Sequence, residues 1–284
     1  MRWLLGADPA DPLVALRCDF WGFNSIGLFD GDEALVVDPG IKPEEIETLR
    51  ARLAAGGAQV TTVVLTHSHH DHIRGWQRFP GAEVHFPRVA AEKSEDARSR
   101  ILAAKLRIDE ELGVRDPEFA YPEGTAVFDD RRDLRIGGLD VQLLFLPGHS
   151  DCTSVVRIPA LKALATADYL VSPGLPYCRW RAREFEAAIR RMTTWVEDGL
   201  VERVVPAHGR VIEGREALLT ALGEESSYFE FARSEVRAEL GSGSSQELVA
   251  RRVASRLGER RGVDLGPRAA QDVDNVRRIL AEEA

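Results

Sequence analysis

The stretch TVVLTHSHHDH, residues 62–72, places four histidines and one aspartate within six consecutive positions, directly after a run of β-branched residues. His67 and His69 are two positions apart at the expected end of a strand, so their side chains are predicted to share one face, while Asp71 and His72 follow where the chain turns. A single histidine on a strand is more often structural than functional. Four candidate ligands at the spacing H-x-H-x-D-H instead predict a metal site.

The rest of the chain reads as strands and helices that lead into loops. Periodicity and turn residues predict a hairpin over 23–38 that turns at Asp30-Gly31, a helix from Pro43 to Gly56-Gly57, a buried strand over 59–67, a surface helix over 90–113, a hairpin over 134–148, a helix over 185–199 and a strand over 201–209. Three times a strand ends in a loop that carries a histidine. After about residue 214 the pattern becomes mostly helical, with GSGSS at 241–245 as a turn.

Composition limits the classes of protein to which the chain can belong. With 284 residues, 44% of them hydrophobic and 29% charged, the chain has the composition of a globular protein with a sizeable core. Its formal net charge of −9 disfavours nucleic acid and anionic lipid as partners. The first residues, MRWLLGADPADP, lack the apolar core of a signal peptide and no apolar run reaches the length of a membrane span, so we expect a cytoplasmic protein.

The three cysteines do not indicate a metal site or a disulfide framework. Cys18, Cys152 and Cys178 are odd in number, widely spaced and without a C-x-x-C pair, so buried free thiols are expected.

The segment THSHHDH resembles the T-H-x-H-x-D-H signature of the metallo-β-lactamase superfamily, and four further motifs follow the order of that family. VVDPG contains Asp38, LPGHSDCTS contains His149, ATADYL contains Asp168 and VVPAHG contains His208. The intervals from His72 through these last three residues are 77, 19 and 40 positions. The resemblance covers roughly residues 15–212 and implies an α+β fold, a four-layer αβ/βα sandwich in a catalytic domain over 1–213, followed by a helical, winged-helix-like C-terminal module over 214–284.

The resemblance also implies two divalent metal ions and their ligands. One ion would be held by His67, His69 and His149, the other by Asp71, His72 and His208, with Asp168 bridging the two. Imidazole and carboxylate ligands suit zinc, and iron or manganese remain possible.

Such a pair of ions makes hydrolysis the expected chemistry. Water bound to the metal has a pKa lowered toward about 7, and two ions roughly 3.5 to 4 Å apart can hold this nucleophile and polarise the substrate together. Asp71 and Asp168 are the expected catalytic carboxylates, and Asp168, as the bridging carboxylate, would offset the repulsion between the cations. Asp38 is expected to orient a ligand histidine by accepting a hydrogen bond, or else to be a turn residue before Pro39-Gly40.

Departures from the family pattern narrow the function. A glutamate at the position of His69 would suggest a diiron redox protein, and a cysteine at Asp168 would resemble one class of antibiotic-hydrolysing β-lactamases. The interval from His149 to His208 leaves no room for the insertion of the larger RNA-processing members. Arg74 replaces a common glycine and is a candidate pocket residue, whereas Cys152 is not expected to bind metal.

The remaining site residues follow from proximity to the motifs. Tyr177 and Trp180 come soon after Asp168 and are predicted to form a pocket wall, with core aromatics as the alternative. His70 is expected to contact the ligands from outside or to face solvent, and His85 to be an ordinary strand histidine.

The C-terminal segment leaves the substrate open. It loosely resembles the helical module of glyoxalase II-like and short lactamase-like hydrolases, and we expect it to shape access to the site. Five of its arginines could line one face over a substrate, although arginines on a helix more often face solvent. They are Arg251, Arg252, Arg256, Arg260 and Arg261. The favoured function is hydrolysis of a small-molecule ester, thioester or lactone. The alternatives are a phosphodiesterase or endoribonuclease and a non-catalytic metal-binding module. A homo-oligomer is possible.

Overall fold

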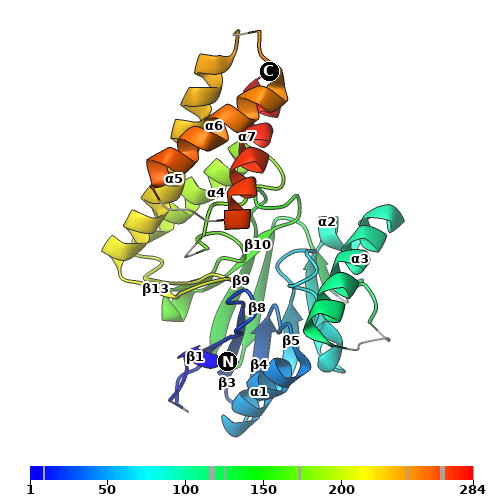
Figure 1. Cartoon of the computed structure of the whole chain (residues 1–284). Coiled ribbons are helices and arrows are strands. Elements are labelled where there is room, and N and C mark those ends of the chain that lie inside the picture. The colour runs from blue at the N-terminus through cyan, green and yellow to red at the C-terminus, as the bar shows by residue number, and fades with distance from the viewer. Residues whose placement is uncertain are drawn as a thin grey trace.

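The chain forms two mixed β-sheets that face each other, with helices on both outer faces (Figure 1). The structure is a computed structural model that describes residues 1–8, 10–114, 119–124, 126–171, 174–241, 243–262 and 266–283. The strand order is β1-β2-β3-β4-β5-β6-β7 in the first sheet and β13-β12-β11-β10-β9-β8 in the second.

Each sheet combines antiparallel hairpins with parallel neighbours. The first contains β1 (Arg2–Leu5), β2 (Leu13–Arg17), β3 (Asn24–Asp30), β4 (Glu33–Val37), β5 (Gln59–Val64), β6 (Glu83–Pro87) and β7 (Ala126–Phe128), and it is parallel from β4 onward. The second contains β8 (Arg131–Ile136), β9 (Leu139–Phe145), β10 (Ser154–Ile158), β11 (Ala163–Ala165), β12 (Arg203–Val205) and β13 (Ile212–Glu213), and β11 and β12 are its parallel pair. Parallel neighbours bring their carboxyl ends to the same edge of the sheet.

Alternation along the strands divides the core into layers. Leu143 and Val156 pack between the two sheets, whereas their neighbours Leu144 and Val155 point to the outer face of the second sheet. This is the period-two pattern of strands that are covered on both faces. The expected four-layer αβ/βα sandwich is therefore confirmed.

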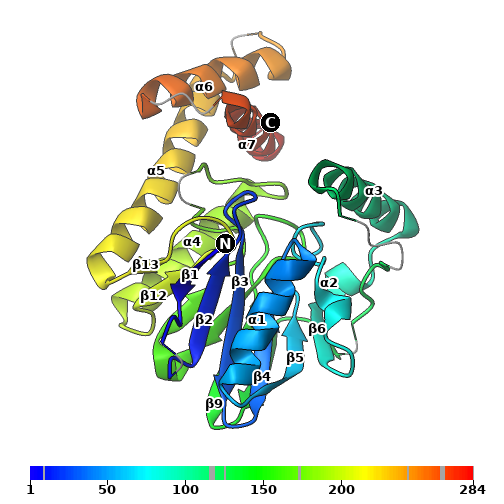
Figure 2. The same cartoon turned by 60° about the horizontal axis from the view of Figure 1, so that its bottom comes forward.

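Helices cover the outer faces. The first sheet carries α1 (Pro43–Ala55), α2 (Arg88–Ala91) and α3 (Glu95–Leu112), and Figure 2 shows α1 lying across that sheet. The second carries α4 (Ala182–Glu197), which is followed after β13 by α5 (Arg215–Glu239), α6 (Gln246–Arg261) and α7 (Ala270–Glu283). Short 3₁₀ turns lie at Trp76–Arg78, Pro159–Leu161 and Gly266–Ala269.

The C-terminal helices share one hydrophobic core with the second sheet. Phe229 of α5, Val253 of α6 and Ile279 of α7 belong to the same buried cluster as Phe185 and Met192 of α4. Figure 1 shows these helices stacked beside α4, on the far side of the molecule from α1. All secondary structure described within residues 214–284 is helical, so the wing of the expected winged-helix module is not seen in those residues. The division into two domains at residue 213 stays a prediction.

Several local predictions are confirmed and two are wrong. The single helix expected over 90–113 is divided into α2 and α3, with residues 92–94 between them. The hairpin turns after Asp30, and α1 begins at Pro43 and ends before Gly56. The strand expected over 59–67, however, ends at Val64, so His67 and His69 lie on a loop. β5 ends there because the backbone N–H of Thr66 donates to the side chain of Asp38, with Oδ1 at 2.8 Å, rather than to a neighbouring strand. Each described helix is too short or too polar to traverse a lipid bilayer.

Candidate metal centre

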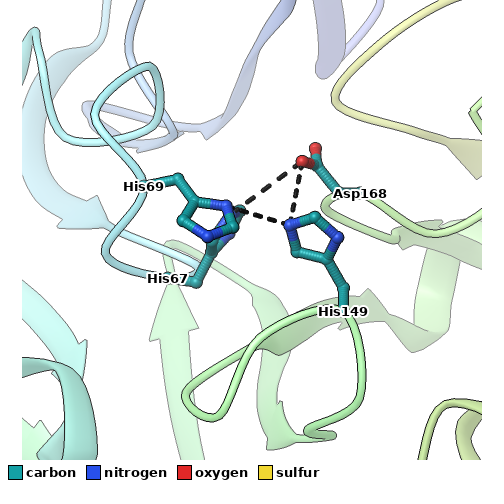
Figure 3. A group of neighbouring side chains, drawn as sticks. All are labelled: His67, His69, His149 and Asp168. Carbon is teal, nitrogen blue, oxygen red and sulfur yellow. Dashed lines mark hydrogen bonds and ion pairs between the residues drawn. The ribbon is translucent and has the colours of Figure 1, made fainter. Parts of the chain in front are cut away.

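Three histidines and an aspartate meet where the strand-end loops converge (Figure 3). His69 Nδ1 lies 2.8 Å from His67 Nε2 and 3.0 Å from His149 Nε2. The Asp168 carboxylate faces the same point, with Oδ2 3.1 Å from His149 Nε2. One ligand atom from each of the four residues lies within 4.8 Å of all the others. This is the first ligand set that the family resemblance implied, assembled around a single point.

Asp71, His72 and His208 form a second group beside the first. Asp71 Oδ2 lies 3.3 Å from His208 Nε2 and 3.8 Å from His72 Nε2, and the three ligand atoms all lie within 4.8 Å of one another. These residues come from the loop after β5 and from the loop after β12. The second expected ligand set is thus also brought together.

Asp168 stands between the two groups. Its Oδ1 is 3.2 Å from His72 Nε2 and 3.6 Å from His208 Nε2, whereas Oδ2 faces His149. One carboxylate oxygen is therefore directed to each group, which is the placement that a bridging ligand requires.

The loops that carry these residues have unusual backbone conformations. Asp38 and Ala167 have φ of 46° and 51°, in the left-handed region that side chains other than glycine seldom adopt. Gly148 precedes His149 where the chain passes close to α4, and a Cβ there would lie 2.5 Å from the backbone of Phe185. Strained backbone of this kind gathers at functional sites, where the surrounding packing maintains it.

Hydrogen bonds fix the orientation of three of the rings. His72 Nδ1 lies 2.8 Å from Asp38 Oδ2, His149 Nδ1 lies 2.7 Å from the carbonyl oxygen of Tyr177, and His208 Nδ1 lies 3.2 Å from that of Trp21. Because each partner is an acceptor, Nδ1 carries the proton and the lone pair of Nε2 points to the centre. Ligand histidines are commonly held in this way.

Asp38 organises the loop as well as one ring. Its carboxylate accepts hydrogen bonds from the Thr66 backbone, from Thr66 Oγ1 at 2.6 Å and from His72. Thr66 Oγ1, having donated to Asp38, accepts from His67 Nδ1 at 3.0 Å. The expected orienting role of Asp38 thus extends to both ligand groups. The sequence interpretation missed the role of Thr66 in this network, although this threonine is part of the signature.

The burial and charge of the centre fit cations. His72 Nε2 and Asp168 Oδ1 are buried and have no hydrogen-bond partner among the described residues, although such atoms are nearly always paired. Burial lowers the pKa of His67 and of His69 well below the ordinary value, so both rings are neutral, as ligands must be. Burial also lowers the pKa of His72, but Asp168, Asp38 and Asp71 outweigh it and raise that pKa, a sign of excess negative charge.

A cavity of about 580 Å³ opens over the two groups. Five of the expected ligands line it, together with His70 and Tyr177. Arg17, Trp21 and Arg179, which the motifs did not indicate, also line it. Gln271 of α7 lines it too, so the C-terminal segment reaches the site as expected. Arg17, Trp21 and Gln271 come from distant parts of the chain, where no local sequence signal marks them, whereas Arg179 lies between the predicted Tyr177 and Trp180.

Two of the pocket predictions do not agree with the structure. Arg74 is only 5% exposed and its guanidinium pairs with Asp109 of α3, so it stabilises packing beneath the site and does not line the cavity. Trp180 is 38% exposed and lies against the guanidinium of Arg181, outside the lining of the cavity.

The other residues near the motifs have structural roles. Cys152 is buried, is within 3.3 Å of Ser68 Oγ and stands outside both ligand groups. His85 is a buried residue of β6 that pairs with Glu83. His70 is partly exposed at the cavity, and its ring lies tilted against that of Trp21, with 5.8 Å between the ring centroids.

The sequence is similar to curated hydrolase-like proteins. It is 25% identical over 197 residues to a beta-lactamase-like protein 2 homolog of Caenorhabditis elegans, covering 68% of this chain and 57% of that protein. It is 27% identical over 207 residues to the acyl-coenzyme A thioesterase MBLAC2 of Bos taurus, covering 65% and 72%. A third match, the hydroxyacylglutathione hydrolase of Aeromonas hydrophila, is 32% identical over 119 residues, 42% of this chain and 36% of that one.

Solved structures share the fold at lower identity. A metallo-beta-lactamase family protein of Thermus thermophilus superposes with a TM-score of 0.65 at 18% identity, over 95% of this chain and 93% of that one. The sec-alkylsulfatase Pisa1 of Pseudomonas gives a TM-score of 0.67 at 15% identity, over 97% of this chain and 49% of that one. The model of the metallo-beta-lactamase superfamily matches residues 19–208, a span that includes every residue of both ligand groups. The chain therefore belongs to the metallo-beta-lactamase superfamily.

Proposed function

We propose that the chain is a dinuclear metal-dependent hydrolase of small-molecule thioesters. The observation that carries this proposal is the meeting of two ligand groups at Asp168, with buried ligand atoms that have no other described partner. We assign His67, His69 and His149 to one ion and Asp71, His72 and His208 to the other. Zinc is the preferred ion because histidine predominates among the ligands.

Divalent ions at this position would supply a nucleophile at neutral pH, by lowering the pKa of water, and would polarise the carbonyl oxygen of the substrate. The chain's own residues determine where that substrate lies. Arg17 and Arg179 bring positive charge to a cavity that contains Asp71 and Asp168. A substrate with an anionic group, and with its acyl carbon over the ligand groups, fits this distribution of charge.

The thioester is preferred over an ester or lactone for two reasons. The curated relatives include proteins named acyl-coenzyme A thioesterase and hydroxyacylglutathione hydrolase. In addition, a thiol has a pKa of about 8.5, so a thiolate leaves without a proton donor. Among the described carboxylates that line the cavity, Asp71 and Asp168 are proposed ligands and Asp19 is paired with the N-terminal amine at 2.7 Å. None of the three is available as an acid.

Three of the five C-terminal arginines give no support to the phosphodiesterase alternative. Arg251 pairs with Glu247, Arg252 with Glu239 and Arg256 with Glu235. Their charges are balanced on the helix surface rather than directed toward the cavity. A non-catalytic metal-binding module would not need both complete ligand groups.

Metal analysis combined with a substrate panel tests the proposal. The panel consists of acyl-CoA and acyl-glutathione thioesters, a chromogenic ester, a lactone, a β-lactam, a secondary alkyl sulfate and a bis-phosphodiester. We expect thioester hydrolysis that chelation removes and zinc restores, loss of activity in His149→Ala, and unchanged activity in His85→Ala. Hydrolysis of the phosphodiester alone would reverse the order of the candidates, and full thioesterase activity in chelator would refute the metal mechanism.

A further inference from the structure

A second cavity, open on one side, lies next to the first and is lined in large part by the C-terminal helices. It has a volume of about 830 Å³ and shares Val171, Gly174 and Leu175 with the cavity over the ligand groups. Its other walls are α5, the end of α6 and the segment just after His208. The two cavities are therefore neighbours across one shared wall.

A buried carboxyl group faces this cavity without a full set of partners. Glu225 of α5 is only 7% exposed, and its Oε1 accepts a hydrogen bond from the Leu170 backbone at 3.0 Å. Its Oε2 is buried and has no hydrogen-bond partner among the described residues. Burial raises the pKa of Glu225 to about 8, so near neutral pH the carboxyl group is mostly protonated and Oε2 can donate.

An arginine of α6 offers further donors at the same cavity. Arg261 lies at the end of α6 and lines the cavity, and its Nη2 is paired with Asp272 at 2.5 Å. Its Nε and Nη1 are buried and have no hydrogen-bond partner among the residues described. Guanidinium N–H groups commonly bind carboxylate or phosphate oxygens in pairs.

The charge of the cavity suits an anion. Arg210 and Arg260 also line it, opposed by Glu224. With Arg261 balanced by Asp272, the walls keep a positive excess in a chain whose formal net charge is −9. Leu175, Ile212 and Leu257 add apolar surface between the charged groups.

We propose that this second cavity binds the anionic far end of the substrate, with a carboxylate or phosphate oxygen accepting from Arg261 Nε and Nη1 and from Glu225 Oε2. The proposal rests on the thioester function, because a substrate that reaches across the shared wall must be longer than the reacting acyl group. Remote binding that is equally strong in the ground state and in the transition state lowers KM without changing kcat.

Gly223 supplies the test. It lies within α5 and lines the cavity, and a Cβ at this position would meet no atom within 4 Å. Gly223→Leu therefore adds a side chain at the cavity wall from a position where the Cβ has free space, and it improves the helix propensity. Ala238→Leu, at an exposed position of the same helix outside the cavity, is the matched control.

The measurements are calorimetric binding of free CoA and of glutathione to the metal-loaded protein, and kinetics with one acyl group on each thiol and on the uncharged thiol N-acetylcysteamine. We expect Gly223→Leu and Glu225→Ala both to weaken binding of the thiol whose anionic group occupies the cavity about tenfold or more, because Gly223→Leu fills part of the cavity and Glu225→Ala removes a hydrogen bond to the anion. KM for that thioester should rise by the same factor. For Gly223→Leu, both kcat and KM for the N-acetylcysteamine thioester should stay as in the wild type. Ala238→Leu should match the wild type throughout, and thermal unfolding shows that all variants are folded.

The thiol whose binding is weakened in the variants identifies the anionic group that the cavity binds. Weakened binding of CoA indicates a phosphate, and weakened binding of glutathione indicates a carboxylate. If neither thiol binds, or if Gly223→Leu binds both like the wild type, the assignment of the cavity is overturned. Failure of the thioester function is a separate result. In that case no thioester is turned over, yet binding of an anionic thiol that Gly223→Leu abolishes would still identify the cavity as an anion site.

Discussion

Glu225 makes the stability of the protein depend on pH in a direction that can be calculated. Its pKa is raised by burial from the ordinary 4.5 to about 8, and the hydrogen bond from the Leu170 backbone offsets only part of this. In the unfolded chain the carboxyl group loses its proton near its ordinary pKa, whereas the folded protein keeps the proton until about pH 8. The folded state therefore binds more protons between these values, and stability falls as pH rises through this window.

The replacement Glu225→Gln removes the titration while it keeps an oxygen that can accept from Leu170. One pKa unit corresponds to about 1.4 kcal/mol, so the shift is worth about 5 kcal/mol in full. Between pH 5 and pH 8 the stability of Glu225→Gln relative to wild type should increase by about 3 to 4 kcal/mol. In a chain of this size that change raises the relative Tm by on the order of 5 to 10 °C.

Urea unfolding of both metal-saturated proteins at several pH values measures this difference, because contributions common to both proteins cancel. Glu230→Gln serves as the control, since Glu230 is exposed on the same helix and its side chain is in solvent whether or not the chain is folded. The difference for this control should stay flat with pH. A flat difference for Glu225→Gln, or one that decreases with pH, would show that Glu225 ionises in the folded protein and would refute the reasoning from burial.

Three further predictions concern the metal centre and the C-terminal helices. Asp38→Ala should lower metal affinity by about 10- to 100-fold, because His72 and Thr66 lose the acceptor that orients them; competition with a chromogenic chelator measures this, and unchanged affinity would contradict it. Asp168→Ala should abolish turnover while circular dichroism stays like the wild type, and activity comparable to wild type at saturating metal would remove its bridging role. Truncation after Glu213 should prevent stable folding, because α5 to α7 bury the outer face of α4, and a truncated chain with the wild-type Tm would show that the catalytic region folds alone.

The metal centre could be predicted from the sequence because metal ions bind particular residue types, and in this chain those residues follow the ends of strands. The ends of β4 and β5 are neighbours in one sheet and those of β11 and β12 in the other, so four motifs far apart in sequence reach one edge. The detail that failed was the strand assignment of His67 and His69. Thr66 gives its backbone N–H to Asp38, and this side-chain partner ends β5 early. A pattern of alternating residues does not reveal such a long-range bond.

Pocket residues were less predictable because their placement depends on tertiary partners. Arg74 follows the signature directly and was expected to line the pocket, but Asp109 on α3 holds it below the site. Trp21 and Gln271, near opposite ends of the chain, line the cavity without any motif. Proximity in sequence to a ligand thus predicted the residues that line the cavity poorly, because the side chain of a residue next to a ligand can point either toward the cavity or toward the core.

The second cavity shows why the C-terminal helices resisted interpretation. In a sequence rich in alanine, glutamate and arginine, each charged residue suggests a solvated surface, and for Arg251, Arg252 and Arg256 the ion pairs on the helix surface agree with that. Glu225 and Arg261 have the same residue types and similar neighbours, yet buried atoms of both lack described partners. Burial of a polar atom is costly unless something satisfies it, so the same side chain that is uninformative on a surface becomes evidence for a ligand inside a cavity. That distinction depends on how α5 and α6 pack together, and only the tertiary structure supplies it.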